Sequence, residues 1–442
     1  MKKIFSPYNI LISLLLTLCA NCYIAVSAHL GLLYIAVPLF IAINAFPAPK
    51  RRDVPGFRMR VCGHGLYMLR AFLPAACVSV VYHAVLLIAS IGAPLWHVLW
   101  SALICIGVLS IAFWNGILSV YCTSVRMGFT LRLLGALFGM VPVLNIVYLT
   151  KIINTVDTEL ELEKACVARD YARAHLAVCD TKYPILLVHG VFFRDFKMFN
   201  YWGRIPAALK RNGARIYYGN HQSALTVAES AAELTARIKE IVEKTKCEKV
   251  NIIAHSKGGL DCRYALSELD AAPYVASLTT VNTPHRGCIY AEKLLNTFPD
   301  KFKNKVAKTY NYALRKLGDS APDFLKAVGD LTYSACEERN EKIKDPEGIF
   351  TQSIGSILSK ADSGHFPLNW SYGIVKQFDG GNDGLVGEDS FEWGEKYTLL
   401  TPKGEQGISH MDVIDLVRRD VEGFDVREFY VELVNDLKKR GL

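Results

Sequence analysis

Ser256 lies in the stretch of this sequence whose residue types and spacing best suit nucleophilic chemistry. It follows an apolar run at residues 250–254 and precedes a Gly-Gly pair, a pattern that predicts a buried strand, a sharp turn and a helix. A serine at such a turn projects its hydroxyl from the backbone, and the small residues Ala254 and Gly258 let strand and helix pass closely. The pattern is G-x-S-x-G with Ala254 in place of the first glycine, and it predicts that Ser256 is a nucleophile.

A serine hydroxyl is a poor nucleophile at neutral pH, so a histidine within hydrogen-bond reach must accept its proton. Where a serine occupies this kind of turn, the chain order is serine, acid, histidine. His410 is the only histidine after His365, and we predict that it is the base. His285 is the main alternative, but it precedes the candidate acids, and we expect it to pack beside the nucleophile turn.

A carboxylate must hold the tautomer and orientation of that imidazole. Asp383 lies among glycines in a tight turn at residues 380–384, and we predict that it is the orienting acid. An Asp-Gly surface turn would also explain Asp383 by itself. Asp379 and Asp389 are nearby alternatives.

The negative oxygen that forms during ester cleavage needs backbone N–H donors. One belongs to the residue after the nucleophile, Lys257, and the other to the loop after an early core strand. Residues 184–188 are an apolar run followed by His189-Gly190, so we choose Val191 as the second donor. A plain strand-ending turn at His189-Gly190 is the alternative.

From residue 182 onwards, short apolar runs alternate with amphipathic helical patterns, which is typical of an α/β sheet. Expected strands lie at 184–188, 215–218, 250–254, 275–281, 349–354 and 397–400, and expected helices at 227–244 and 425–437. The continuous apolar character of the 184–188 run suits a central strand buried on both faces.

These motifs together resemble the bacterial triacylglycerol lipases of the α/β-hydrolase superfamily. The matching stretches are 182–190, 254–260, 283–287, 382–386 and 410–412. The resemblance covers residues 182–442 and implies a carboxylic ester hydrolase with Ser256, Asp383 and His410 as its triad. That chemistry proceeds through an acyl-enzyme and requires no cofactor.

The resemblance also implies a structural calcium ion near the catalytic histidine. Asp412 matches one ligand position, and Asp362 is a weaker candidate for another, since the residues around it diverge. Two carboxylates with carbonyl oxygens suit Ca²⁺. A salt-bridged Asp412 without metal is the alternative.

A lid is expected near residues 288–330, where such lipases carry theirs. Within it, Phe302, Val306 and Tyr310 recur at near-helical spacing among lysines. We interpret this stretch as a basic amphipathic helix that lies on anionic lipid. A solvated helix packed on the core is the alternative.

The first 150 residues hold the long apolar runs, each suited to crossing a bilayer, which takes about 20 residues. Crossings are expected near 8–28, 31–47, 72–92 and 97–121. A fifth segment at 133–150 is short and broken by Pro142 and Asn145, so it spans, re-enters or lies at the interface. A cleaved signal peptide ending at Ala28 is the alternative for the first run.

We therefore expect an all-helical transmembrane domain of four or five helices in residues 1–150. A linker helix at 151–180 and an α/β-hydrolase catalytic domain at 181–442 follow. The basic loop at 50–70 indicates a cytoplasmic side there. Four crossings then leave the catalytic domain inside and five leave it outside, and the cysteines of the later half favour the inside.

The net charge of +8 lies largely beside hydrophobic segments, which favours a membrane surface and not nucleic acid. We expect an integral protein of a bacterial cytoplasmic membrane whose partners are membrane lipid and an acyl lipid or ester substrate. A thioesterase, phospholipase or acyltransferase on the same fold remains an alternative. A catalytically inert membrane scaffold is another.

Overall fold

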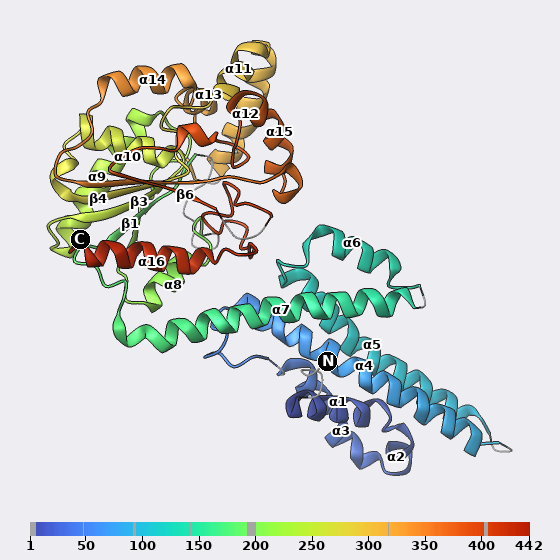
Figure 1. Ribbon diagram of the computed structural model, residues 1–442. Coiled ribbons are helices and arrows are strands. Elements are labelled where there is room, and N and C mark those ends of the chain that lie inside the picture. Colours follow the sequence, from blue (N-terminus) through green and yellow to red (C-terminus); the bar gives the residue numbers. More distant parts are fainter. Residues whose placement is uncertain are drawn as a thin grey trace. The chain divides into compact units, whose positions relative to one another are not determined.

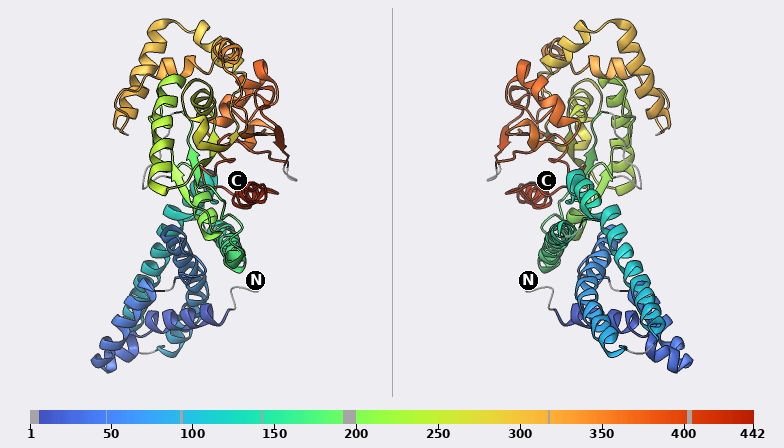
Figure 2. Two further views of the ribbon diagram at one scale, coloured as in Figure 1. Left: turned by 90° about the vertical axis from the view of Figure 1, so that its left-hand side faces the viewer. Right: turned by 90° about the vertical axis from the view of Figure 1, so that its right-hand side faces the viewer.

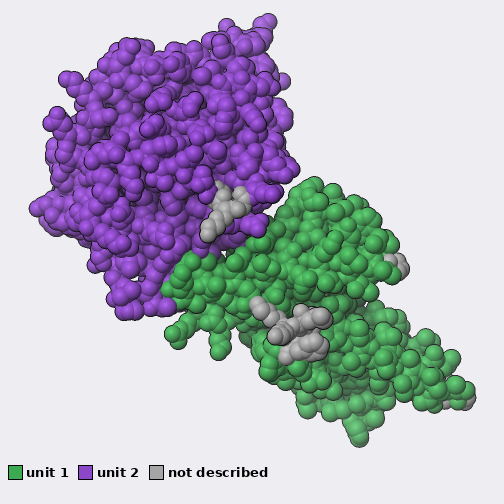
Figure 3. Space-filling view, in the orientation of Figure 1, with its two compact units in different colours: residues 1–169 green, residues 170–442 purple. Residues whose placement is uncertain are grey.

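The computed structural model describes the chain except for residues 1–5, 47, 92–93, 142, 192–199, 317 and 402–404. The described chain divides into two compact units, residues 1–169 and 170–442 (Figure 3). Each unit is built around hydrophobic cores of its own.

The larger unit is built on a parallel sheet of six strands (Figure 1). The strands are β1 (Ile185–Val188), β2 (Ile216–Tyr218), β3 (Val250–His255), β4 (Val275–Val281), β5 (Phe350–Ser356) and β6 (Lys396–Leu400). Their order across the sheet is β2-β1-β3-β4-β5-β6. The predicted α/β architecture is thus confirmed, and every predicted strand is present within two residues of its expected ends.

The two faces of the sheet are covered by different helices (Figures 1 and 2). On β1, Ile185 and Leu187 pack with α8 (Ile205–Arg211) and α16 (Val426–Lys439), whereas Leu186 and Val188 pack with α9 (Val227–Thr245) and α10 (Lys257–Glu268). Successive side chains of a strand point to opposite faces. An uninterrupted apolar run is therefore required when both faces are covered, as the sequence predicts for β1.

The strand order reverses between β1 and β3, because β2 lies on the outer side of β1 and β3 on its inner side. In parallel α/β sheets the loops at the carboxyl ends of the strands diverge at such a reversal and leave room for a site. The loop after β1 and the turn after β3 therefore meet at this edge.

Five helices surround that carboxyl edge. They are α11 (Ile289–Thr297), α12 (Asp300–Lys316), α13 (Phe324–Gly329), α14 (Tyr333–Lys342) and α15 (Leu368–Asp379). The first three lie in the expected lid region of residues 288–330, and α15 contacts α11.

The residues through which the chain passes into the larger unit are held at the amino-terminal edge of the sheet, opposite to the carboxyl edge just described. The carboxylate of Asp170 accepts hydrogen bonds from Arg211 Nη2 at 2.7 Å and from Arg173 Nη2 at 3.0 Å. The amide of Lys182 donates to the carbonyl of Leu442 at 2.9 Å, just before β1 begins. The chain therefore enters this unit at the edge away from the site loops.

The smaller unit is helical. Its helices are α1 (Pro7–Ala20), α2 (Tyr23–Ala28), α3 (Leu33–Ala45), α4 (Phe57–Ala89), α5 (Trp96–Thr123) and α6 (Gly128–Phe138), followed by α7 (Leu144–Arg173), whose last turn belongs to the larger unit. Among the described helices, α4 and α5 are long and apolar enough to cross a membrane, and α1, α3 and α6 are shorter apolar helices.

Only 17% of the most apolar 18-residue stretch of α4 is buried inside the structure, and 28% of the corresponding stretch of α5. A core helix of a soluble protein would be covered more fully, so these helices favour membrane association. The fifth apolar segment, residues 133–150, is divided between α6 and the start of α7 and does not form one helix. The helix expected from residue 151 accordingly begins earlier, at Leu144.

Candidate active site

Ser256 occupies the sharp turn between β3 and α10. Its backbone has φ 55° and ψ −131°, a conformation that strains any residue with a β-carbon. Two hydrogen bonds hold the turn: the amide of Ser256 donates to the carbonyl of Val281 at 2.9 Å, and Thr283 Oγ1 donates to the carbonyl of Ser256 at 2.9 Å. The surrounding strands therefore impose the strained conformation that exposes the serine hydroxyl.

The loop after β1 approaches this turn so closely that glycine is required on both sides. A β-carbon at Gly190 would lie 2.8 Å from Ser256 Cβ, and one at Gly258 would lie 2.5 Å from the carbonyl oxygen of His189. Real β-carbons do not make contacts this short, so neither position tolerates a side chain without movement of backbone.

The structure brings His410 and Asp383 into direct contact. His410 Nδ1 lies 2.6 Å from Asp383 Oδ2, and the amide of His410 donates to the carbonyl of Asp383 at 2.9 Å. A carboxylate can only accept at this distance, so Nδ1 carries the proton and Nε2 of the neutral ring keeps its lone pair. His410 and Ser256 line the same cavity.

The carboxylate of Asp383 is fully buried and saturated with donors. Its Oδ1 accepts from the amides of Leu385 and Val386 at 2.9 and 2.8 Å, and its Oδ2 also accepts from Asn282 Nδ2 at 2.6 Å. These bonds fix the orientation of the carboxylate.

The two alternative acids have other roles. The carboxylate of Asp379 accepts from the amides of Ile289 and Tyr290 at the start of α11, and burial raises its pKa. Asp389 is exposed, and its backbone carbonyl accepts a bond from Arg286. Of these carboxylates, Asp383 is the one that contacts the imidazole of His410.

The shared cavity has a volume of about 140 Å³ and a largely apolar wall. Besides Ser256 and His410, its lining includes Val191, Leu331, Leu385 and Met411. The wall suits a hydrocarbon chain placed beside the serine hydroxyl.

The two residues predicted as oxyanion donors lie close to Ser256 in the structure or in the chain. Val191 lines the cavity with Ser256, and Lys257 is the first residue of α10, where the helix dipole favours negative charge. The loop that continues from Val191, residues 192–199, lies outside the described residues.

Tyr201 is a site residue that the sequence did not suggest. Its buried hydroxyl accepts a bond from the amide of Gly190 at 3.1 Å and lies 2.6 Å from His255 Nδ1. Burial and the neighbouring His410 hold the pKa of His255 well below its usual value, so His255 is neutral and accepts the tyrosine proton. Tyr201 thus ties the loop after β1 to the strand that carries the nucleophile.

The side chain of Lys257 belongs to a buried polar network, which was also not predicted from the sequence. Its ammonium donates to Asp261 Oδ1 at 2.7 Å and to Ser230 Oγ at 3.0 Å, and Lys257 and Asp261 are both only 1% exposed. Asp261 Oδ2 lies 3.8 Å from His221 Nε2, and the ring of His221 stacks on that of His189 at 4.0 Å. The network therefore links the two sides of the predicted oxyanion site.

Burial raises the pKa of Asp261 to about 6, and the charge of Lys257 offsets only part of that effect. Above that pH the Asp261 carboxylate is ionised. A search for buried i, i+4 charge pairs next to the nucleophile would have found Lys257 and Asp261. Tyr201 lies 54 residues from its partner His255, and no local signal links them.

His285 is not among the residues that line the cavity of Ser256 and His410, and it is held by other groups. Its Nε2 lies 2.9 Å from Thr280 Oγ1 and its Nδ1 3.2 Å from Arg263 Nη1, and its ring stacks on Trp393 at 5.0 Å. Burial and the charge of Arg263 keep its pKa well below the usual value. These contacts are those of a packed structural histidine.

The two expected calcium ligands have different surroundings. The side chain of Asp362 is 74% exposed and lies 3.5 Å from Lys360, whereas Asp412 is buried and its Oδ2 accepts from Ser409 Oγ at 2.7 Å. Calcium takes six to eight oxygens. In the part of the chain that the structure describes, no group of three or more His, Cys, Asp or Glu side chains could hold a metal.

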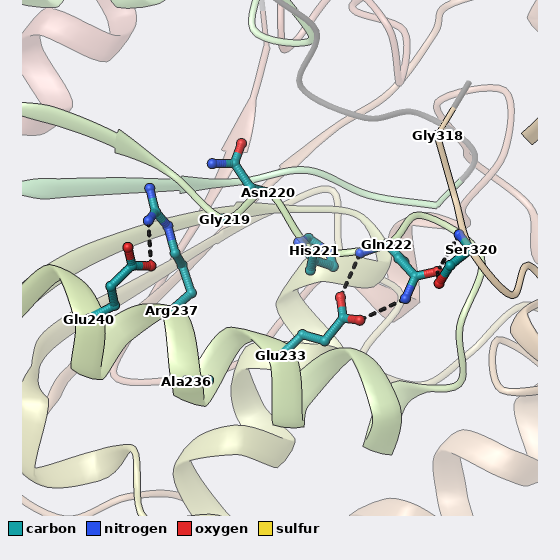
Figure 4. Close-up of a pocket in the computed structure, with 10 residues that line it drawn as sticks. All are labelled: Gly219, Asn220, His221, Gln222, Glu233, Ala236, Arg237, Glu240, Gly318 and Ser320. Carbon is teal, nitrogen blue, oxygen red and sulfur yellow. Dashed lines mark hydrogen bonds and ion pairs between the residues drawn. The ribbon is translucent and has the colours of Figure 1, made fainter. Parts of the chain in front are cut away.

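A second hollow of about 570 Å³ is polar and lies beside β2 and α9 (Figure 4). In it, Gln222 joins two walls: its Nε2 donates to Glu233 Oε1 at 2.7 Å and its Oε1 accepts from Ser320 Oγ at 2.7 Å. Arg237 pairs with Glu240 at 2.6 Å. The polar groups of these side chains are thus bonded to one another. Neither Ser256 nor His410 lines this hollow.

Sequence comparison identifies related proteins for the larger unit. The family model described as palmitoyl protein thioesterase matches residues 184–321. A triacylglycerol lipase of Pseudarthrobacter phenanthrenivorans is 36% identical over 164 residues, which cover 34% of this chain and 51% of that protein. A triacylglycerol lipase of Vibrio cholerae is 26% identical over 298 residues, covering 62% of this chain and 93% of that protein.

The chain spans about half the length of the first curated relatives that it matches, 51% and 45%. Among solved structures, the mature lipase BlEst2 of Bacillus licheniformis has a TM-score of 0.43 and 22% identity, covering 57% of this chain and 92% of that one. Phospholipase PlaB of Legionella pneumophila has a TM-score of 0.37 and 13% identity, covering 59% and 64%. The sequence matches show a lipase-like α/β-hydrolase segment after the helical unit.

The Lys257–Asp261 pair predicts a strongly non-additive stability cycle. Lys257→Met or Asp261→Leu alone leaves one buried charge without its partner, which costs about 3–5 kcal/mol. The double variant removes both charges together, so we expect it to unfold at a higher temperature than either single variant. Thermal unfolding of the four proteins in one detergent measures the coupling. Additive losses would show that the two side chains do not act as a pair.

Proposed function

We propose that this lipase-like α/β-hydrolase is a membrane-anchored serine hydrolase that cleaves carboxylic esters of acyl lipids. The observation that carries the proposal is one apolar cavity lined by Ser256 and by His410, whose Nδ1 binds the buried carboxylate of Asp383. The relatives compared above are triacylglycerol lipases, which supports the ester class.

In the proposed reaction, Ser256 Oγ attacks the ester carbonyl while His410 Nε2 takes its proton. The amides of Val191 and Lys257 donate to the oxyanion of the tetrahedral intermediate. His410 then protonates the departing alcohol and leaves an acyl-enzyme on Ser256. Water, deprotonated by the same imidazole, attacks the acyl carbonyl. His410 then returns that proton to Ser256 Oγ as the fatty acid leaves.

Asp383 acts on this cycle through its charge and its geometry. The carboxylate holds the His410 tautomer whose Nε2 is free to accept, and it stabilises the imidazolium that forms in each half-reaction. Because four donors already bind its oxygens, the carboxylate is fixed before substrate arrives. No bond to Asp383 is made or broken.

A second candidate function is thioester hydrolysis, which the match of residues 184–321 to the palmitoyl protein thioesterase model favours. The same nucleophile, base and oxyanion donors would serve it, with a thiol as the leaving group. Phospholipase and acyltransferase activities likewise differ in the alcohol or acceptor. An inert scaffold would not need the donor-saturated acid or the strained serine.

We assign membrane anchoring to residues 1–150, connection to residues 151–180 and catalysis to residues 181–442. A lipid partner is supported further by α12, whose exposed lysines include Lys301, Lys305 and Lys308. Phe302 and Tyr312 on the same helix are 50% and 61% exposed. Basic residues with exposed aromatic rings suit the interface of an anionic bilayer.

A fluorophosphonate probe tests the nucleophile. We expect the wild-type protein to be labelled and Ser256→Ala to be unlabelled, because the probe needs the activated hydroxyl. Ser267→Ala, on the same helix α10, serves as the matched control and should label normally. Absence of labelling in folded wild-type protein would favour the inert scaffold. A panel of acyl esters and thioesters then ranks the leaving groups.

Tyr201→Phe tests the bond between the oxyanion loop and the nucleophile strand. The change removes both hydrogen bonds of the hydroxyl, each worth about 1 kcal/mol, so we expect kcat to fall by roughly thirtyfold. KM changes little, because the aromatic ring that lines the cavity remains. Steady-state hydrolysis of a soluble short-chain ester provides both constants. Tyr217→Phe on β2 is the control with an equal loss of one hydroxyl. A pure rise in KM would contradict a positioning role for Tyr201.

Charge reversal on α12 tests lipid contact. With Lys301, Lys305 and Lys308 changed to glutamate, we expect activity on anionic vesicles to fall severalfold and activity on a soluble ester to persist. The control reverses three exposed lysines at the end of α9 and just after it, Lys239, Lys244 and Lys246. Equal loss on both substrates would instead assign α12 a purely structural role.

A further inference from the structure

The segment formed by α6 and the first turns of α7 presents a continuous apolar surface. Large side chains exposed on it are Phe129, Leu133, Leu137, Met140, Val141, Val143, Leu144, Ile146 and Val147. Met140, between the two helices, is 91% exposed. The 11 residues of α6 rise about 16 Å, roughly half of a bilayer core, so α6 does not span it.

Packing fixes this segment as a hairpin of two helices. The rings of Phe138 and Tyr148 stack with centroids 5.3 Å apart and an interplanar angle of 13°. A β-carbon at Gly135 would lie 2.5 Å from Tyr121 Oη on α5 and 3.0 Å from Ile152 Cδ1 on α7. The hairpin therefore has a defined shape, with its apolar tip directed away from these contacts.

The hairpin begins and ends at the same end of the α4–α5 pair. At its start, Ser124 Oγ donates to Glu159 Oε2 at 2.6 Å, which joins the end of α5 to α7. At its end, Glu159 pairs with Arg58 at 3.1 Å and Asp157 pairs with Arg70 at 2.7 Å, which joins α7 to the first half of α4. The chain thus leaves this end after α5 and has returned to it by residue 157.

A core of buried apolar residues strengthens the same junction. Ile152, Val156 and Leu160 of α7 pack with Cys62 and Leu66 of α4. In Figures 1 and 2, α7 crosses α4 and α5 at the end opposite to their connecting turn. A segment that crossed the bilayer could not bring residues 152–160 back to the end from which α6 began.

We propose that the α6–α7 hairpin is a wedge that inserts its apolar tip into one leaflet, and that the catalytic unit follows on the side of the basic loop at residues 50–70. The proposal rests on the proposed membrane anchoring of residues 1–150. In that arrangement α4 and α5 cross the bilayer and residues 133–150 do not, and the lysines and arginines of the basic loop assign the shared side to the cytoplasm.

The occupant of the apolar tip is the acyl-chain region of an anionic leaflet. Exposed Arg126 and Lys151 flank the tip, before α6 and early in α7, where they can meet lipid phosphates. Lys151 Nζ also lies 5.3 Å over the ring of Tyr148, an arrangement suited to the interfacial layer. A helix-pairing surface for a second copy would not need cations at both ends.

Cysteine labelling in cells tests the side. The background changes exposed Cys77 and Cys122 and the partly exposed Cys22 and Cys247 to serine. Cysteines are then introduced singly as His29→Cys, Asp53→Cys and Glu243→Cys. We expect a membrane-impermeant maleimide to label His29→Cys in intact cells, and the other two only after permeabilisation. Labelling of Glu243→Cys in intact cells would show that residues 133–150 cross the bilayer, which would overturn the proposal. Labelling of Asp53→Cys in intact cells would also overturn it, because the basic loop would then lie outside.

Depth is tested with the full chain in vesicles that contain anionic phospholipid. Met140→Cys carries an environment-sensitive fluorophore, and bromines on the acyl chains quench it. We expect strong quenching by bromines, and Asp53→Cys, the control, should not be quenched. If the fluorophore at Met140→Cys is not quenched, the hairpin tip does not enter the acyl-chain region and the proposed wedge is overturned. Labelling of Ser256 by a fluorophosphonate, measured on the same samples, reports separately on the proposed hydrolase.

Discussion

The close crossing of the loop after β1 over the turn after β3 is the constraint on which the site depends. Ser256 is held at a positive φ, and Gly190 and Gly258 are needed because no side chain fits between the two segments. The local strain of the turn costs on the order of 1–3 kcal/mol. Burial of β1 and β3 on both faces provides the rigid frame that offsets it. Tyr201 and the Lys257–Asp261 pair then brace the same crossing from its two sides.

The sequence predicted the sheet well, since strands buried on both faces appear as short apolar runs bounded by turn residues. It also pointed to Asp383 and His410, which are in contact, and to Ser256 and His410, which line one cavity, because their order and their glycine-flanked turns are local features. It could not reveal Tyr201, Asn282 or His221, whose partners lie at least 32 residues away in the chain. The solvent exposure of Asp362, one of the two expected calcium ligands, is likewise a tertiary property that the sequence does not reveal.

The number of crossings was ambiguous in the sequence for a different reason. Hydropathy measures how apolar a segment is, and the 133–150 stretch is apolar whether it spans or folds back. The deciding facts are contacts between segments, such as that between Arg58 and Glu159, which lie 101 residues apart. Such pairing of α4 and α7 fixes the path of the chain where composition cannot.

The bond between the Lys182 amide and the Leu442 carbonyl places the entry of the chain at the amino-terminal edge of the sheet. The cavity lies at the other edge, about 20 Å away along the six residues of β3. The tether is thus mechanically separate from the catalytic groups. Its length and stiffness can vary between Leu160, where the packed junction ends, and Asp170, where the larger unit begins, without disturbing the bonds around Ser256. The length of the connection between the two units and the chemistry at Ser256 can therefore change independently in evolution.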